Sequence, residues 1–206
     1  MATGLVDVSL TDFLDFAIRA GTPKLTKVAE VKRRGQYSPA ADYWRPLREK
    51  IQELHESGSF DIKALEQFAG TYADPKKVER YSAAVRGYKR FLGRKAVSWL
   101  KPPYSVWTPS RLRVRINPEV GLRVAGSKYI LKLYFKNERL SKYRVDLLTF
   151  LLRHQLSQSA PGAEFGVLDV ANARLFPASQ ATTDLMPLLL GEAASFVAIW
   201  DGIGAL

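Results

Sequence analysis

The spacing of apolar residues changes near Lys95, and this change limits the possible folds more than any other feature of the chain. Before it, Tyr81, Val85 and Tyr88 recur at intervals of about three to four residues, which is typical of one face of a helix. After Pro102-Pro103, apolar and polar residues alternate, which is typical of strands. We therefore expect an all-helical first part and a second part that combines strands with helices.

Turn and cap residues divide both parts into elements. In the first part we expect helices over residues 10–21, 24–33, 61–68 and 75–91, and one that starts at Ser38-Pro39 or at Pro46 and ends at Ser57-Gly58. In the second part we expect strands over 111–116, 119–124 and 128–136, a helix over 141–156, a hairpin over 165–176, and a helix from Thr182 or Thr183 to Trp200. This order predicts an α+β fold. A helical N-terminal lobe, residues 1–74, is followed by a core, residues 75–206, in which helix, β-meander, helix, β-hairpin and helix build a mixed sheet.

The expected strand over residues 128–136 has a regular alternation of side chains. Lysines stand at 128, 132 and 136 on one face, together with Ile130 and Tyr134, while the intervening positions are apolar. The expected strand over 111–116 likewise carries an arginine at every second position. Because side chains alternate across a strand, we expect a sheet with one apolar face and one cationic face.

The net charge of +11 is concentrated in the middle of the chain. Residues 76–153 contain 20 lysines and arginines and 4 acidic residues, whereas residues 1–75 contain 10 and 11, and residues 154–206 contain 1 and 5. Such a concentration favours a polyanionic partner. We expect nucleic acid, with DNA and RNA both compatible, and an acidic partner protein is the alternative.

Missing residue types exclude several classes of function. The chain has no cysteine, which excludes disulfides, thiolate metal sites and cysteine nucleophiles and fits a cytoplasmic location. Its two histidines, His55 and His154, are too few for a multi-histidine metal centre, and we expect both to be surface or capping residues. The most apolar stretch, residues 185–200, is interrupted by Pro187, Gly191 and Glu192, so we expect a core helix and no membrane association.

Two short motifs carry a resemblance to a known family. Pro118-Glu119 lies at the start of the second expected strand of the meander, and Ile130-Leu131-Lys132 lies on the third, with Ile130 eleven residues after Glu119. Together with the order helix, meander, helix, strand, these motifs resemble the PD-(D/E)XK superfamily, the restriction-endonuclease-like fold. In that family an acid on the second strand and an acid-x-lysine on the third hold a divalent metal for phosphodiester cleavage. Here isoleucine stands in place of the second acid.

The resemblance implies a set of candidate catalytic residues. Glu119 would be the ligand of Mg²⁺ or Mn²⁺, Lys132 the catalytic lysine, and Glu192 an acid relocated to the last helix; Glu79 and Asp146 are alternatives for that acid. A metal that acts on a phosphodiester needs at least two carboxylates, so Glu119 alone would bind it poorly. Structural roles, such as ion pairs for the two glutamates and a place in the basic face for Lys132, are the alternatives. We therefore expect a degenerate site and no cofactor, and an active metal-dependent nuclease is the second hypothesis.

The leading hypothesis is nucleic-acid binding without catalysis. Basic side chains would contact phosphates, and an aromatic side chain would stack on a base. The expected interface comprises Lys89, Arg90, Arg94, Lys95, Arg111, Arg113, Arg115, Arg123, Lys128, Lys132, Tyr134 and Lys136. Acidic residues of the N-terminal lobe, Asp12, Asp15, Glu49, Glu53, Glu56 and Glu66, could instead cover this face. The basic segment would then be an interface between the two parts of the chain. A third hypothesis is a noncatalytic adaptor that docks on an acidic partner protein, and the sequence leaves the oligomeric state open.

Overall fold

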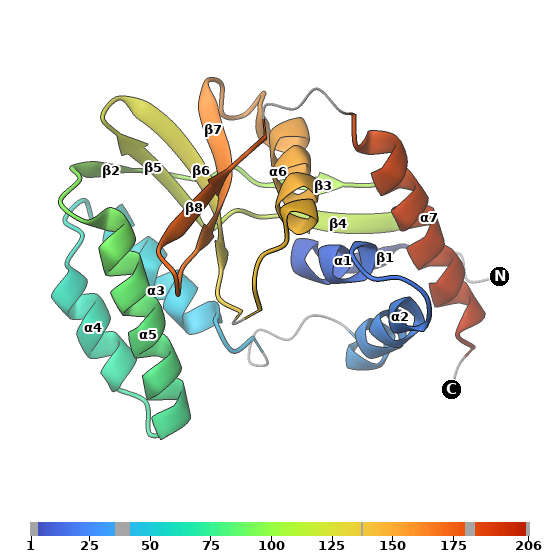
Figure 1. Cartoon of the computed structure of the whole chain (residues 1–206), viewed down its shortest axis with the longest axis horizontal. Coiled ribbons are helices and arrows are strands. Elements are labelled where there is room, and N and C mark those ends of the chain that lie inside the picture. Colours follow the sequence, from blue (N-terminus) through green and yellow to red (C-terminus); the bar gives the residue numbers. More distant parts are fainter. Residues whose placement is uncertain (1–3, 36–41, 137, 180–183, 205–206) are drawn as a thin grey trace.

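The computed structural model describes residues 4–35, 42–136, 138–179 and 184–204. This part of the chain contains seven helices and eight strands, which Figure 1 labels. The helices are α1 (Leu10–Ala17), α2 (Thr22–Arg34), α3 (Arg45–Glu56), α4 (Ile62–Gly70), α5 (Pro75–Leu92), α6 (Lys142–Leu156) and α7 (Met186–Gly202). The strands are β1 (Val6–Ser9), β2 (Val97–Leu100), β3 (Ser105–Trp107), β4 (Leu112–Ile116), β5 (Val120–Val124), β6 (Ser127–Tyr134), β7 (Ala163–Asp169) and β8 (Arg174–Pro177). The α+β fold that the sequence predicts is confirmed.

Cap residues set the ends of several helices. The Ser9 hydroxyl accepts a hydrogen bond from the Asp12 N–H at 3.0 Å and so begins α1. Asp74 begins α5 in the same way, through the Lys76 N–H at 2.9 Å. Gly93 ends α5 with a φ of 56°, in the left-handed region that favours glycine.

The start of α3 agrees with the second of the two expected starts, because the helix begins at Arg45, next to Pro46. Proline is suited to the first turn of a helix, where its missing N–H leaves no helical hydrogen bond unmade. The other expected start, Ser38-Pro39, lies outside the described residues, as do Thr182 and Thr183 before the last helix.

The strands form two sheets. The larger has the order β2-β5-β6-β7-β8, in which β6 and β7 are parallel and the other neighbours are antiparallel. α6 connects β6 to β7, as a parallel pair requires a crossover. The smaller sheet has the order β1-β4-β3, with β1 parallel to β4.

The meander differs in one strand from the expected one. Residues 111–116 form β4, which pairs with β1 and β3, and β2 takes the expected place beside β5. The arginines of β4 and the lysines of β6 thus belong to different sheets, so the prediction of a single cationic sheet face is wrong. Alternation shows that a strand has a buried side, but it does not show which strand is its neighbour.

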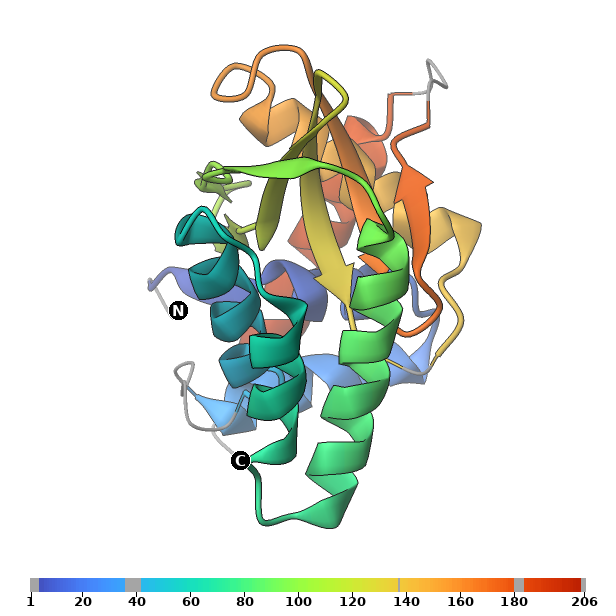
Figure 2. The ribbon, with the colours of Figure 1, turned by 90° about the vertical axis from the view of Figure 1, so that its left-hand side faces the viewer.

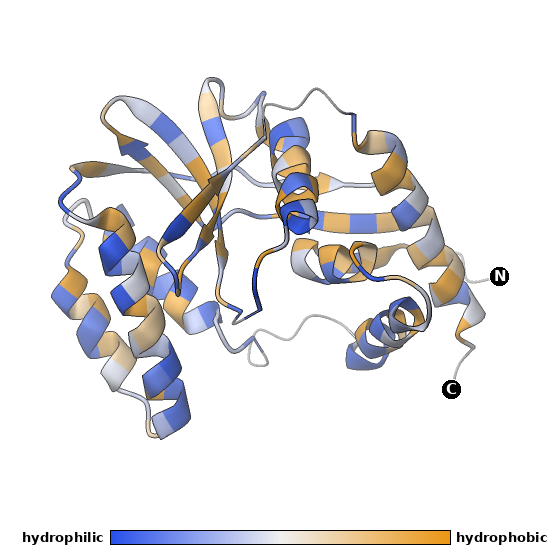
Figure 3. Ribbon diagram, viewed as in Figure 1, coloured by the Kyte–Doolittle hydropathy of each residue, from blue (hydrophilic) through white to orange (hydrophobic). Residues whose placement is uncertain are grey.

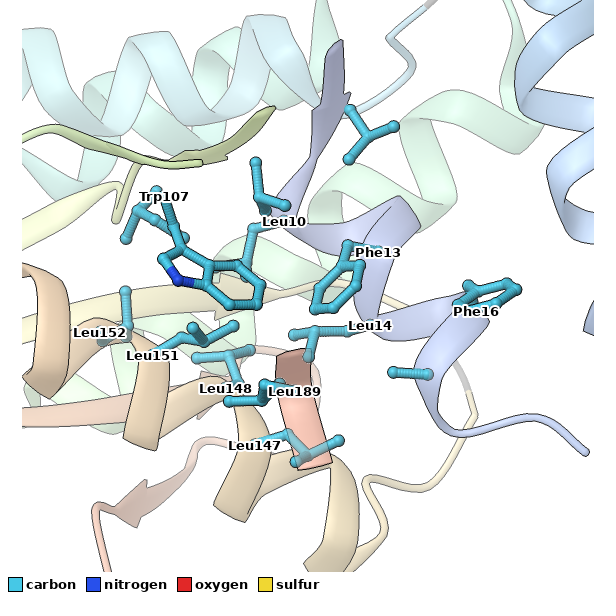
Figure 4. Packing of buried hydrophobic residues seen from close by; sticks show 14 of the residues in the cluster. Leu10, Phe13, Leu14, Phe16, Trp107, Leu147, Leu148, Leu151, Leu152 and Leu189 are labelled. Carbon is cyan, nitrogen blue, oxygen red and sulfur yellow. The ribbon is translucent and has the colours of Figure 1, made fainter. Parts of the chain in front are cut away.

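Two hydrophobic clusters lie on opposite faces of the larger sheet. One joins Ile130 and Phe165 to α1, α2, α6, α7 and the inner side of the smaller sheet. Figure 4 shows its centre, where Trp107 lies near the leucines of α6 and the edge of Phe13, with 5.5 Å between the two ring centroids. The other cluster joins Leu131 and Leu168 to α3, α4 and α5. β6 is consequently buried on both faces.

The expected boundary at residue 74 does not separate the two clusters. Phe13 and Leu151 share one cluster, and Ile51 and Val85 share the other, so each cluster draws residues from both sides of the boundary. β1, near the start of the chain, also pairs with β4. The division into two domains therefore stays a prediction.

The apolar helix α7 packs into the first cluster through Leu189, Ala193 and Phe196. Phe196 meets Phe16 of α1 edge to face, with 5.0 Å between the ring centroids. Across the four described ranges, no helix is both long enough and apolar enough to cross a membrane.

Candidate nucleic-acid interface

Glu119 and Lys132 lie side by side on neighbouring strands. Glu119 directly precedes β5, and the Lys132 Nζ atom on β6 is 2.5 Å from Glu119 Oε1. Lys132 Nζ also donates to the carbonyl oxygen of Asn117 at 3.0 Å. The exposed fractions of Glu119 and Lys132 are 6% and 7%. The structure therefore brings together two residues that the family resemblance singled out, but it buries both.

Protein groups already satisfy the Glu119 carboxylate. Besides the Lys132 ammonium, Oε2 accepts a hydrogen bond from the Leu133 N–H at 2.8 Å. The Arg48 Nε atom on α3 lies 3.8 Å from Oε1, and the Gln52 amide donates to the Glu119 carbonyl at 2.8 Å. A buried carboxylate needs such partners to offset the cost of losing water. Lys132 is thus one half of a buried ion pair, and its expected place on an exposed basic face is wrong.

The residues around Glu119 do not fit a divalent metal. No group of three or more acidic, histidine or cysteine side chains comes together within the described ranges. Ile130, in the position of the missing acid, is 2% exposed in the first cluster. Glu192 instead pairs with Lys24 at 2.5 Å, and Figure 1 shows its helix α7 on the opposite side of the molecule from β5. The expectation that Glu192 supplies the second acid is therefore not met.

Arg113 and Arg115 of β4, and Arg111 just before it, lie toward the outer side of the smaller sheet. Arg111 forms an ion pair with Asp201 at 3.0 Å, and the Arg113 Nε atom is 3.7 Å from Asp7. Arg115 is half-buried. Arg111 and Arg113 are thus partly balanced by acids.

The candidate residues of the β5–β6 hairpin do not form one surface either. Arg123 is exposed and Lys128, opposite it, is half-buried. Lys136 pairs with Asp15 at 2.7 Å. Tyr134 is 7% exposed and donates its hydroxyl to a backbone carbonyl at 3.0 Å, so it offers no face to a base. Its expected stacking role is wrong, because β6 is covered on both sides.

N-terminal acids cover the basic segment at only a few points. Asp15 of α1 holds both Lys136 and the buried Arg144, the latter at 2.6 Å. Glu66 of α4 pairs with Lys89 of the basic segment. Three further acids pair within their own part of the chain: Asp12 with Lys27 and Arg34, Glu49 with Arg45, and Glu53 with Lys50. Burial by itself would raise the pKa of Asp12, but the bond from Ser9 and the charges of Lys27 and Arg34 outweigh it and lower that pKa. The expected cover of the whole basic segment is not found.

Helix α5 carries the most extended set of exposed cations. Its 18 residues include six lysines and arginines and one acid, Glu79. Tyr81, Val85 and Tyr88 are buried on its inner side. We define the α5 surface as the exposed basic residues of this helix and of the loop after it. They are Lys76, Arg80, Arg86, Lys89, Arg90, Arg94 and Lys95.

The α5 surface lies on the outside of the molecule. Figure 2 shows α5, in green, at the front of the view, where it runs from the sheet to the lower end of the molecule with α4 beside it. Figure 3 shows hydrophilic residues along the same helix. Lys89 pairs with Glu66 at 2.9 Å, whereas no other member of the surface has an acidic partner among the described residues. Arg90 donates to the Ala171 carbonyl at 2.8 Å. The positive potential of this side is therefore little reduced by nearby acids.

The sequence pointed to only part of this surface. Lys89, Arg90, Arg94 and Lys95 were expected there, and Lys76, Arg80 and Arg86 were missed. The signal that could have found them is helical spacing, because residues four apart share a side of a helix. Lys76 and Arg80, and then Arg86 and Arg90, are such pairs.

Of the two histidines, His55 is buried, against the expectation, and His154 is exposed. His55 is 3% exposed, and its Nε2 atom is 2.7 Å from the Tyr88 hydroxyl oxygen. Burial lowers the pKa of His55 to about 4 and raises that of Tyr88. The expected surface position of His55 is wrong, since its ring also stacks on Phe60 and Trp99. His154 is exposed, as expected.

The comparisons with known proteins add no family to this geometry. No protein-family model matches the chain, and no curated protein matches its sequence. A function must therefore be argued from the chemistry of the buried pair and the α5 surface.

Proposed function

We propose that the chain binds nucleic acid through the α5 surface and does not cleave it. The observation that carries this proposal is the set of seven exposed cations on α5 and its following loop, of which only Lys89 has an acidic partner in the described ranges. An 18-residue helix is about 27 Å long, so its cations can meet several successive phosphates. The absence of cysteine is compatible with a cytoplasmic site for this binding.

Phosphate contacts supply affinity but little sequence selectivity. We therefore expect binding that weakens steeply with salt, because each cation that contacts a phosphate releases counterions. The first experiment is fluorescence anisotropy with labelled single-stranded and double-stranded DNA and RNA at about 50 mM and about 200 mM salt. The polymer that binds best decides between DNA and RNA.

Two variants that remove equal charge locate the interface. The first replaces Lys76, Arg86 and Arg94 with glutamine. None of these three cations forms an ion pair within the described residues. The matched control replaces Arg113, Arg123 and Lys128, which the sequence placed on a cationic sheet face. We expect the α5 variant to bind more weakly and its slope of log affinity against log salt to shrink by about 2 to 3 units, at about 0.7 to 0.9 per phosphate contact. The control should bind almost as the parent chain does.

The outcomes separate the hypotheses. Equal losses in both variants would show a general charge effect and refute an interface on α5. An unchanged α5 variant would also refute it. If the parent chain binds no polymer at the lower salt concentration, nucleic-acid binding is wrong, and docking of an acidic protein becomes the better hypothesis. In that case unlabelled nucleic acid should displace the acidic protein from the chain only weakly.

A metal-dependent nuclease remains the second candidate because Glu119 and Lys132 are in contact on adjacent strands. The sheet order β2-β5-β6-β7, with α6 between two parallel strands, also supports the resemblance that suggested it. Against it, the site supplies a single carboxylate that already has three partner groups. Mg²⁺ or Mn²⁺ is added to the binding samples and the products are separated on a gel. Cleavage that Glu119→Gln abolishes would favour this candidate over binding alone.

A further inference from the structure

A small recess opens beside the α5 surface. It has a volume of about 160 Å³ and lies between α5, Trp44 at the start of α3, Phe135 at the end of β6, and the turn after β7. Its lining consists of Trp44, Glu79, Arg80, Ala83, Ala84, Phe135 and Ala171. The recess therefore combines an apolar floor with one acid and one of the cations of the α5 surface.

The walls of the recess are held in place by packing. The Trp44 ring stacks on Tyr81 and on Phe135, with ring centroids 5.4 Å and 4.8 Å away. α5 also approaches the turn after β7 closely, since a Cβ atom on Gly87 would lie 1.8 Å from the Val170 oxygen. A recess with such walls exists before a ligand arrives, which spares the ligand the cost of ordering it.

The rim carries two charged side chains that have polar groups open to a ligand. Glu79 and Arg80 are both exposed, and neither has an ion-pair or hydrogen-bond partner in the described part of the chain. The Arg80 guanidinium carbon lies 5.8 Å from the centre of the Tyr43 ring. A carboxylate accepts hydrogen bonds only, whereas a guanidinium donates them and stacks on flat rings.

The size and chemistry limit the occupant. Sites for drug-sized ligands usually have about 300 Å³ or more, so this recess accommodates a single flat ring system and not a whole nucleotide. A nucleobase has apolar faces and a polar edge, and its phosphates would remain outside on the cations of α5. Guanine suits the carboxylate best, because adjacent N–H groups on its edge can both donate to Glu79.

We infer that the recess takes one unstacked base, preferably guanine, of a single strand that lies along the α5 surface. This inference rests on the proposed function and adds to it a preference for single strands and a base-reading site. The base enters with its face against the apolar lining and its edge toward Glu79. Duplex nucleic acid cannot offer a base in this way without unpairing it.

The test uses three short single strands of the polymer type that binds best. All three consist of thymidine units and differ only at the central position, which is a guanine, a thymine or an abasic site. We expect the parent chain to lose about 5- to 150-fold in affinity between guanine and the abasic position, the range measured for stacked bases. Ala83→Leu fills the recess and should abolish this difference while it leaves the salt slope unchanged. Ala29→Leu on α2, another half-buried helical alanine, is the matched control and should keep the difference.

Glu79→Gln gives an independent signature. Removal of one negative charge should tighten binding to every strand, because the surface becomes more cationic. It should at the same time reduce the preference for guanine over thymine. If the parent chain binds all three strands equally, the base site is wrong while nucleic-acid binding stands. If it binds none of them but binds duplex, the base site is wrong and nucleic-acid binding stands; if it binds neither single strands nor duplex, both proposals fail.

Discussion

The buried pair of Glu119 and Lys132 allows a direct test of whether these residues are structural. Lys132→Met removes the ammonium and keeps a side chain of similar length, and Glu119→Leu removes the carboxylate. The double variant removes both charges from a site where the exposed fractions are only 6% and 7%. If the pair stabilises the fold, each single change leaves a buried charge or hydrogen-bond donor without its partner. The double variant should then lose less free energy of unfolding than the sum of the two single variants.

The structure sets the expected magnitudes. Breaking a buried pair from one side costs about 3 to 5 kcal/mol. Lys132→Met should lie near the lower limit, at about 3 kcal/mol, because Glu119 keeps the Leu133 N–H at 2.8 Å and Arg48 at 3.8 Å. Glu119→Leu should cost about 4 kcal/mol, since it also leaves the Leu133 N–H without its acceptor. The double variant should lose about as much as Glu119→Leu alone, which gives a coupling free energy of about 3 kcal/mol.

The assay is urea unfolding followed by far-ultraviolet circular dichroism, with the m-value used to verify that unfolding stays two-state. The pair Lys142–Asp146, in which the lysine side chain is 84% exposed and the aspartate side chain 23% exposed, provides the more solvated control. Lys142→Met, Asp146→Leu and their double variant should give a coupling below about 0.5 kcal/mol.

Two results would refute this reasoning. A coupling for Glu119 and Lys132 as small as the control value would mean that the pair adds no stability. A Lys132→Met variant more stable than the parent chain would indicate that the lysine is retained for activity at the expense of stability. The second result would strengthen the nuclease hypothesis.

Two further predictions concern buried positions. Because the native pKa of His55 is about 4 and the ordinary value is 6.5, the unfolded chain binds a proton between these limits that the native chain does not. The free energy of unfolding should therefore fall by up to about 3 kcal/mol as the pH drops from 7 to 4. The His55→Phe variant should lack this part of the pH dependence, and parallel urea titrations at both pH values check it. Gly87→Ala should lower the free energy of unfolding by at least about 3 kcal/mol, since its Cβ would lie 1.8 Å from the Val170 oxygen. Gly191→Ala is at an exposed helical position with open space around it, and should raise the free energy of unfolding by about 0.5 to 1 kcal/mol. Thermal unfolding of both glycine variants measures the difference, and equal melting temperatures would contradict it.

Local patterns in the sequence predicted much of the fold. Ser9 and Asp74 are caps whose side chains satisfy nearby N–H groups, and such bonds depend only on neighbouring residues. The contact between Glu119 and Lys132 was also accessible, because consecutive antiparallel strands fix the register across a short turn. In each of these features, the residues that interact are close to each other in the sequence.

Features that depend on distant neighbours were not predicted. β1 and β3 have four and three residues, too few for a reliable alternation. The strand with Arg113 and Arg115 pairs with β1, about one hundred residues earlier, and no local signal indicates that partner. The burial of Lys132 likewise depends on α3, which places Gln52 and Arg48 over Glu119.

This difference explains why basic residues on strands and on α5 should be assigned separate roles. On β6 a lysine between two packed faces must find a carboxylate, whereas on α5 half of the helix stays in water and its cations need none. Lys132→Met should therefore reduce the free energy of unfolding and leave nucleic-acid affinity unchanged at temperatures where the variant is folded. The triple α5 variant should do the reverse, with weaker binding and an unchanged unfolding midpoint. If instead Lys132→Met weakens binding in the folded state, the buried pair belongs to the binding site, and the polymer must reach the start of β5, next to Glu119, as well as α5.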